Sequence, residues 1–394
     1  MIIHTKNLFK GKVIKFLDEN QDMNHVLKIK DRITIFLRKR VKNTKEIEKE
    51  LRLNSRSTRK ALFDLEKENV VKRIRKKKMR RKFGESDSWT LIKDNNIAEK
   101  IQNGKICIFY KTFHKRNISK KHYLLIQKEI LLNEDYISAL GFFQAEGSKK
   151  RKATETVNSE PILISLFLNF LEYFGIKKKD LSFKVIFNKK ITRQLNIDKK
   201  DLEKKSKKFW DKIIDSTKYK YRKSNYTGTF KGRLRKEPLI YGSLSIEYCS
   251  TIFRAFLAEL LKKVKNNLKD KKEIIAYLRG FFAGEAYVGR QDREIQIASI
   301  DPEELHFAQR LLKRIGVTCS ISKKTSTAPP RIIITNLKSF LILENCNIFK
   351  FHPFKKRNLL IKILNYQSIE GNLKKQLEVK LSEIEKLIKF RYIN

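Results

Sequence analysis

Residues 139–148, ALGFFQAEGS, and residues 277–288, YLRGFFAGEAYV, share one pattern. Each contains a glycine, two phenylalanines, one further residue, a small residue and a glutamate. The two glutamates, Glu146 and Glu285, are 139 positions apart (285 − 146). A pattern that recurs at this distance predicts two copies of one structural unit.

Interpreted as helices, both copies place small residues four positions apart on one face: Gly141 with Ala145, and Gly280 with Gly284. Such pairs let two helix backbones approach closely. Because glycine costs about 1 kcal/mol against alanine inside a helix, its presence here predicts that the two helices pack against each other. We expect the neighbouring phenylalanines of both copies to be buried in the core: Phe142, Phe143, Phe281 and Phe282.

The segments that follow the two copies have the same order of patterns, which predicts an α+β fold of two pseudo-symmetric α-β-β-α-β-β-α halves with antiparallel sheets. A charged insertion in the first half, residues 199–236, has no counterpart in the second and is predicted to be helical near residues 199–214. The predicted strands are residues 181–187, 238–248, 319–323 and 331–336, and the predicted closing helices are residues 249–264 and 356–367.

The charge is strongly positive, with 90 Lys and Arg against 43 Asp and Glu and a formal net charge of +47. A surplus spread along the whole chain predicts a large polyanionic partner, and nucleic acid fits best. No apolar run approaches the roughly 20 residues of a bilayer helix, and no secretory signal is evident. We therefore expect no membrane contact, no small-molecule substrate and a cytoplasmic, nucleoid-associated protein. The cysteines and histidines are scattered and form no zinc-type spacing.

Glu146 and Glu285 end their predicted helices, where the negative end of the helix macrodipole disfavours a carboxylate. If the helices pair, the two carboxylates also come close to each other. Like charges at short distance raise one pKa or recruit a cation, and clustered carboxylate oxygens favour Mg²⁺ or another divalent cation. This arrangement predicts metal-assisted attack on a phosphodiester.

The first 95 residues have a different pattern. Residues 29–40, 43–53 and 54–71 predict three helices, with Asn43 or Thr44 and then Asn54 or Ser55 as caps, and residues 70–92 predict a two-stranded wing. In the third helix, Leu62, Phe63 and Leu65 are expected to point inward. Residues 96–133 are expected to connect this domain to the repeats, with a strand at residues 105–113.

This segment resembles the winged helix-turn-helix family, whose third helix usually enters the major groove while the wing touches the backbone. The resemblance implies groove contacts from Ser55, Arg56, Ser57, Arg59 and Lys60 and phosphate contacts from Arg73, Arg75, Lys77, Arg80 and Arg81. The alternative is a basic three-helix domain that only packs against its neighbour.

Over roughly residues 135–365 the chain resembles the LAGLIDADG homing endonucleases, specifically the single-chain type with two repeats. The resemblance implies that the motif helices form the interface between the halves, that each half lays a curved sheet along double-stranded DNA, and that the chain acts as a monomer. By the same resemblance, Glu146 and Glu285 are the metal-binding catalytic residues. It further implies a lysine in the last strand region of a half, Lys355 first and Lys356 second, which polarises the attacked phosphate or its water.

The chain departs from the family pattern in three places. An acidic position often seen earlier in the motif is Gln144 in one copy and Ala283 in the other. The closing glycine, Gly147, is Ala286 in the second copy, and alanine would cost about 1 kcal/mol if this position needs a left-handed backbone. The first-half stretch that matches the lysine region, residues 245–256, offers only Arg254.

The sequence therefore predicts a site-specific double-strand DNA endonuclease of the homing type, intron-encoded or free-standing, that uses Mg²⁺. The predicted domains are residues 1–95, 96–133, 134–268 and 269–394, the last with a C-terminal helix. Two alternatives stay open: a DNA-binding transcriptional regulator that has kept the fold and lost cleavage, and an RNA-binding intron maturase.

Overall fold

A computed structural model of the chain divides into two compact units, residues 2–130 and residues 131–394 together with Met1. Each unit is described by itself. The structure describes residues 1–4, 8, 15–17, 29, 33, 36–37, 42–67, 70–74, 88–91, 105–113, 119–127, 129–147, 153–188, 196–214, 225–227, 241–290, 292–299, 301–322 and 329–392.

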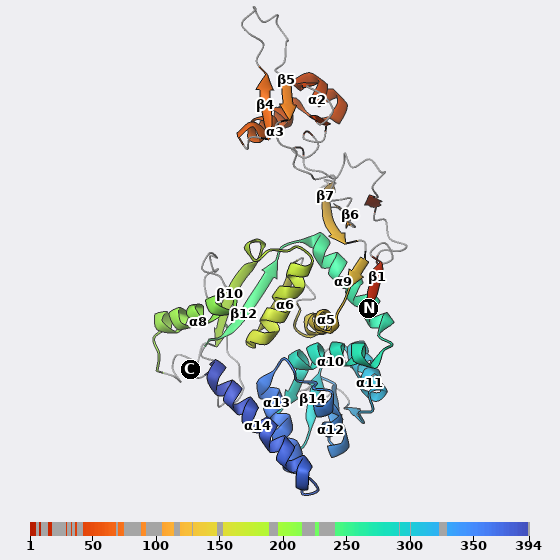
Figure 1. The fold of residues 1–394 in the computed structure, drawn as a ribbon, viewed down its shortest axis with the longest axis vertical. Helices are drawn as coiled ribbons and strands as arrows, with labels where there is room; N and C mark the ends of the chain where they lie inside the picture. The colour runs from red at the N-terminus through yellow and green to blue at the C-terminus, as the bar shows by residue number, and fades with distance from the viewer. Residues whose placement is uncertain are drawn as a thin grey trace, which may run out of the picture. The chain divides into compact units, whose positions relative to one another are not determined.

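The smaller unit contains helices α2 (Thr44–Leu51) and α3 (Ser55–Lys67) and three small sheets among its described residues (Figure 1). Of the helix predicted at residues 29–40, the described residues 29, 33, 36 and 37 are helical, and the others lie outside the described residues. Helices α2 and α3 lie beside a sheet of order β3-β5-β4, built from Lys42–Asn43, Ser88–Leu91 and Val71–Ile74. A second sheet has the order β2-β6-β7, from Lys15–Leu17, Lys105–Phe113 and Ser119–Gln127, and a third pairs β1 (Ile2–His4) with β8 (Glu129–Leu131). The strand predicted at residues 105–113 is confirmed as β6.

The predicted caps of α2 and α3 are found in the structure. The Asn43 side chain accepts a hydrogen bond from the Glu46 amide at 2.9 Å, and the Asn43 amide donates to Glu46 Oε2 at 2.8 Å, which forms a capping box. The Asn54 side chain accepts from the Ser57 amide at 2.8 Å. Behind these caps the helices bury one apolar cluster: Ile33, Leu37, Ile47, Leu51, Ala61, Leu62, Leu65, Val70 and Val71.

Phe63 contradicts the prediction that it points inward. Its side chain is 43% exposed, and the Arg73 guanidinium lies over its ring at 5.1 Å from the centroid. Leu62 and Leu65 lie on the buried face, and Phe63 is one position after Leu62, about 100° around the helix. It therefore leaves that face, and a cation from strand β4 covers its ring.

The larger unit contains two four-stranded sheets, of orders β11-β10-β12-β9 and β13-β14-β16-β15. All neighbouring strands run antiparallel except β10 and β11, which are parallel. The strands are β9 (Thr154–Asn158), β10 (Ser182–Asn188), β11 (Asn225–Thr227), β12 (Ser243–Tyr248), β13 (Ala286–Val288), β14 (Ile295–Ala298), β15 (Ser320–Ser322) and β16 (Arg331–Ile334). The main helices are α5 (Glu134–Glu146), α6 (Pro161–Tyr173), α8 (Lys199–Ile214), α9 (Thr251–Asn267), α10 (Lys271–Glu285), α11 (Pro302–Arg314), α12 (Leu337–Asn345), α13 (Pro353–Leu364) and α14 (Gly371–Tyr392).

Alternate residues of the strands are buried, as expected for sheets with one covered face. In β10 the buried residues are Phe183, Val185 and Phe187, and in β14 they are Ile295 and Ile297. Helices α5 and α10 lie side by side in this unit (Figure 1), where α5 contacts α6 and β9 while α10 contacts α11, β13 and β14. The paired helices therefore connect the cores of the two sheets.

The predicted helices at residues 199–214, 249–264 and 356–367 and the strands at residues 181–187, 319–323 and 331–336 are found close to their expected bounds. Of the strand predicted at residues 238–248, residues 243–248 form β12, while residues 238–240, like residue 323, lie outside the described residues. Two features differ from the prediction. Residues 337–345 form helix α12, which the sequence patterns did not indicate. The stretch assigned to the last strand region of the second half begins helix α13, so that Lys355 lies in a first helical turn.

Candidate functional site at the ends of two paired helices

Helices α5 and α10 meet backbone to backbone at their glycines. A Cβ atom added to Gly141 would lie 2.2 Å from the Tyr277 carbonyl oxygen, and one added to Gly280 would lie 1.8 Å from the Ser138 carbonyl oxygen. Across this contact the Ser138 hydroxyl donates to the Ala276 carbonyl at 2.8 Å. Glycine is required on both sides because a side chain would push the helices apart.

Polar contacts around the pair fix its register. Arg279 of α10 forms an ion pair with Glu134 of α5 at 2.9 Å and also donates to the Cys346 carbonyl at 3.0 Å. Lys350 forms an ion pair with Asp135 at 3.0 Å. The four phenylalanines of the two motif copies are buried, each with 3% exposure or less.

Glu146 and Glu285 are the last residues of the two helices, and both are half-buried. A Cβ atom added to Gly284 would lie 2.5 Å from Ala145 Cβ, 3.0 Å from Glu146 Cγ and 3.6 Å from Glu146 Oε1. The Glu146 side chain therefore lies against the residue that precedes Glu285. The two helix ends, each carrying a carboxylate, converge as the repeated pattern predicted.

Asn158, at the end of strand β9, donates its side-chain amide to Glu146 Oε1 at 3.3 Å. The sequence patterns did not single out this residue. Its partner on α5 is 12 positions earlier in the chain, a contact that no local pattern records. The contact orients one carboxylate oxygen of Glu146.

The chain leaves both helices with the same backbone conformation. Gly147 has φ −70° and ψ 137°, and Ala286 has φ −74° and ψ 135°. The left-handed backbone that would have made alanine costly is not present, because both residues are extended and L-residues adopt this region freely. The substitution of glycine by alanine in the second copy brings no backbone strain to Glu285.

Lys355 reaches the end of α10. Its ammonium nitrogen donates to the carbonyl oxygens of Phe282 at 3.2 Å, Ala283 at 2.6 Å and Gly284 at 3.1 Å. The neighbouring Lys356 instead donates to Asn347 Oδ1 at 2.9 Å. Lys355 therefore lies at the helix end that carries Glu285, where it contacts backbone carbonyl oxygens of α10.

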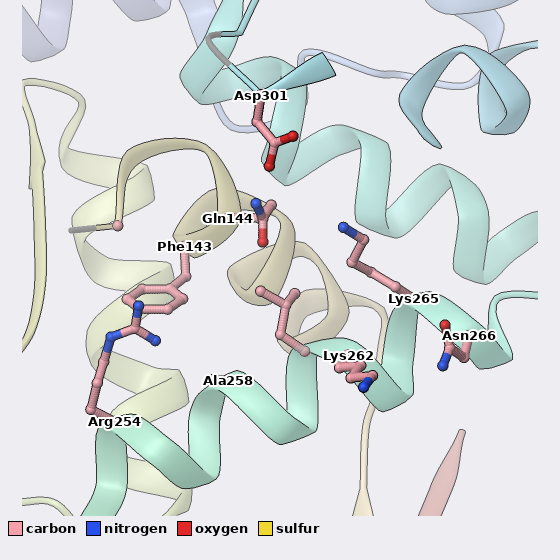
Figure 2. Close-up of a pocket in the computed structure, with 10 residues that line it drawn as sticks. Phe143, Gln144, Arg254, Ala258, Lys262, Lys265, Asn266 and Asp301 are labelled. Carbon is pink, nitrogen blue, oxygen red and sulfur yellow. The ribbon is translucent and has the colours of Figure 1, made fainter. Parts of the chain in front are cut away.

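Arg254 lies at the end of the other helix. Its guanidinium lies over the Phe143 ring at 5.1 Å, and burial lowers the pKa of Arg254. Next to it, a pocket of about 380 Å³ borders the end of α5 (Figure 2), where Gln144 lies below Asp301 in the view, between Phe143 and Lys265. The pocket is lined by Phe143, Gln144, Gly147, Arg254, Ala258, Leu261, Lys262, Lys265, Asn266 and Asp301.

One basic residue of this pocket, Lys265, contacts other side chains of the protein. Lys265 forms an ion pair of 2.6 Å with Glu304, and its ammonium lies over the Phe307 ring at 4.6 Å. Gln144 stands where the motif often carries an acidic residue, and it is buried with 7% exposure. The pocket at the first-half helix end therefore contains three basic side chains, Arg254, Lys262 and Lys265, and the carboxylate of Asp301, while Gln144 itself brings no carboxylate.

Glu146 and Glu285 bring one carboxylate each to the two converging helix ends. Proteins usually hold a magnesium ion through one or two carboxylates while substrate phosphates and water supply the other ligands, so this pair of residue types fits such an ion. Across the described part of the chain, no group of three or more His, Cys, Asp or Glu side chains is arranged to hold a metal by itself.

The basic residues predicted to contact DNA in the smaller unit differ in their surroundings. Arg56, Arg59 and Lys60 are exposed on α3. Arg73 forms an ion pair with Glu66 at 3.4 Å in addition to its contact with the Phe63 ring, so it also stabilises its own domain. Arg75 and Arg80, with Lys77 and Arg81, lie outside the described residues.

In the described part of the chain, no helix is long and apolar enough to cross a membrane.

No curated protein matches the chain. Among solved structures, I-DmoI in complex with DNA and Mn is 14% identical, with 55% of this chain and 98% of that chain covered and a TM-score of 0.32. The N-terminal LAGLIDADG domain of DUF199/WhiA is 15% identical, with 54% and 82% covered and a TM-score of 0.31. Full-length DUF199/WhiA from Thermatoga maritima is 12% identical, with 65% and 69% covered and a TM-score of 0.32. Residues 272–346, which hold nearly all of α10 and the whole sheet β13-β14-β16-β15, match the family model of the LAGLIDADG-like domain.

Proposed function

We propose that the protein is a site-specific endonuclease that cuts both strands of duplex DNA with Mg²⁺ held by Glu146 and Glu285. The observation that carries the proposal is the contact of the Glu146 side chain with Gly284, which brings two carboxylate-bearing helix ends together in a chain of net charge +47. The match of residues 272–346 to the LAGLIDADG-like domain supports it, because this match contains Glu285 and its helix.

Each residue of the site would have a separate role in cleavage. Glu146 and Glu285 would hold the metal through their carboxylates. When bound, the ion supplies an activated water and stabilises the leaving oxygen. Asn158 holds one oxygen of Glu146 through its side-chain amide, and the basic residues beside α5, Arg254 and Lys262 among them, attract the DNA backbone.

We further propose that residues 134–268 and 269–394 are two pseudo-symmetric repeats, each of which lays its sheet along the DNA. The support is a similar order of elements. In the described residues a motif helix is followed by strand β9 in the first half and by strands β13 and β14 in the second, and then by a helix with proline in its first turn, Pro161 in α6 and Pro302 in α11. The central strand pair of each sheet, β10 with β12 and β14 with β16, is antiparallel. A single chain with both repeats would act as a monomer.

Residues 1–95 are proposed to be a winged helix-turn-helix domain, joined to the repeats by residues 96–133. The support is a three-stranded sheet, β3-β5-β4, against α2 and α3, with Arg56, Arg59 and Lys60 exposed on α3. Such a domain would place α3 in the major groove. An intron-encoded or free-standing mobile element and a cytoplasmic, nucleoid-associated location belong to the same proposal.

The exposed basic face of α3 also favours a second candidate function, a DNA-binding transcriptional regulator without cleavage. The two functions differ in what the carboxylates do. In a regulator the charges of Glu146 and Glu285 would be dispensable, whereas in an endonuclease each is needed for the chemistry.

The test is cleavage of a randomised duplex library by the parent, Glu146→Gln and Glu285→Gln, with and without Mg²⁺. Each variant is expected to cut at least one strand about a thousandfold more slowly, because metal-assisted activation contributes several kcal/mol to the transition state. DNA binding should persist or tighten, since a carboxylate that faces phosphates has been removed. Glu378→Gln, an exposed change on α14, is the matched control and should cut like the parent. Parental cleavage by both core variants would refute the assignment, and a parent that cuts no DNA would favour the regulator.

A further inference from the structure

The end of α10 is held by a side chain from a different helix. Where α10 gives way to β13, the Ala286 amide donates to the Phe282 carbonyl, and the carbonyls of Ala283 and Gly284 have left the regular helical ladder. Lys355, in the first turn of α13, donates to all three of these carbonyls. The position of Lys355 is itself fixed, because the His352 side chain and Pro353 begin α13.

This contact suits the chemistry of both groups. The last carbonyls of a helix have no intrahelical donors, and a lysine ammonium carries three N–H donors and no acceptor. Its positive charge also offsets the negative end of the α10 macrodipole, which otherwise opposes the charge of Glu285 in the last position of the helix. The ammonium therefore makes the end of α10 both better ordered and more favourable for a carboxylate.

We propose that Lys355 is a positioning residue, which caps α10 and thereby holds Glu285 in place, and that it does not contact the phosphate. This inference rests on the proposed function, in which Glu285 is a metal ligand. It replaces the role expected from the family resemblance, in which this lysine polarises the phosphate or its water.

Only the end of α10, and not the end of α5, depends on Lys355. In the first half, the first turn of α9 carries Arg254, whose guanidinium lies over the Phe143 ring. The end of α5 is closed by the Gly147 amide, which donates to the Phe143 carbonyl at 2.8 Å. The carbonyls to which Lys355 donates all belong to α10. Loss of the Lys355 cap should therefore disturb Glu285 and leave Glu146 in place.

The test compares the full chain with Lys355→Met, which removes the charge at similar length, and Lys355→Arg, which keeps charge and donors. Lys386→Met, an exposed change on α14, is the control. In Lys355→Met we expect the backbone amides of residues 285–288 to exchange hydrogen at least about tenfold faster, with the rest of the chain unchanged. On DNA we expect the strand blocked by Glu285→Gln to be cut about 100-fold more slowly, the cost of a displacement of about 1 Å. The other strand should be cut at the parental rate, so that nicked DNA accumulates.

Two further readouts separate positioning from contact with the phosphate. The pH profile of cleavage by Lys355→Met should keep the parental shape, and Lys355→Arg should recover most of the lost rate. Equal loss on both strands, a changed pH profile, or lost cleavage with unchanged hydrogen exchange would overturn the proposal. If the parent cuts no DNA, the proposed function fails, and the exchange measurement still decides whether Lys355 caps α10.

Discussion

Replacement of Gly280 by alanine tests the close contact of α5 and α10. The added Cβ would lie 1.8 Å from the Ser138 carbonyl oxygen and 2.6 Å from the Phe142 amide nitrogen, both of them backbone atoms that no rotamer change can move. Real contacts of this kind are essentially never shorter than 3.0 Å, so the helices must separate by about 1.2 Å. Overpacking of this kind costs about 1–3 kcal/mol. Loss of the Ser138–Ala276 hydrogen bond lowers the free energy of unfolding by about 1 kcal/mol. The higher helix propensity of alanine raises it by about 1 kcal/mol.

We therefore expect Gly280→Ala to lower the free energy of unfolding by about 1–3 kcal/mol, measured by urea denaturation. Because a shift of about 1 Å between reacting groups can reduce a rate 10²-fold, cleavage should fall about 100-fold under conditions where the variant is folded.

Gly175→Ala is the matched control. Gly175 has φ +76° and no atom within 4 Å of an added Cβ, so alanine there costs about 1–2 kcal/mol through backbone strain alone. It should lose similar stability and keep parental cleavage. The reasoning is refuted if Gly280→Ala is as stable and as active as the parent, or if both variants lose activity to the same extent.

Three further predictions concern other parts of the chain. The Tyr277 hydroxyl is buried with no hydrogen-bond partner among the described residues, and burial first, with Glu304 second, raises the pKa of Tyr277 well above its usual value. Because the folded state disfavours the ionised form, the contribution of Tyr277 to the free energy of unfolding is full below about pH 10 and is lost as the pH rises further. Tyr277→Phe removes the unpartnered hydroxyl, so it should raise the free energy of unfolding by about 1 kcal/mol and reduce the fall of that free energy at alkaline pH, measured by urea denaturation. The affinity for duplex DNA should fall steeply with salt, with a log–log slope of magnitude about 5–10, and a flat response in fluorescence anisotropy would contradict an extended basic surface. A fragment of residues 1–130, cut where the two units divide, should fold alone and bind duplex DNA weakly, and an unfolded circular dichroism spectrum would count against it.

The paired helices could be predicted from the sequence because a close helix contact needs small residues at fixed spacing. Gly141 and Gly280 are such residues, and each contacts the backbone of the other helix. Strands such as β10 and β16 could be predicted because one covered face produces alternation. In both cases the physical cause acts locally along the chain.

The remaining features depend on contacts that local patterns do not record. Lys355 donates to carbonyl groups more than 70 positions earlier, and every residue type has a carbonyl. Phe63 belongs to an apolar run in which neighbouring positions lie on different faces of the helix, so its exposure could not be read from composition. The conformation of Gly147 could not be known either, because glycine accepts both extended and left-handed backbone.

The hydrogen bond between Ser138 and Ala276 joins residues 138 positions apart. Closure of so long a segment costs much chain entropy before any contact forms, whereas α6 against α5, or α11 against α10, closes far shorter segments. During synthesis from the N-terminus, α5 is complete long before α10 exists, and Glu146 has no partner carboxylate until then. The two carboxylates can therefore meet only late in folding, and an incomplete chain cannot assemble the site.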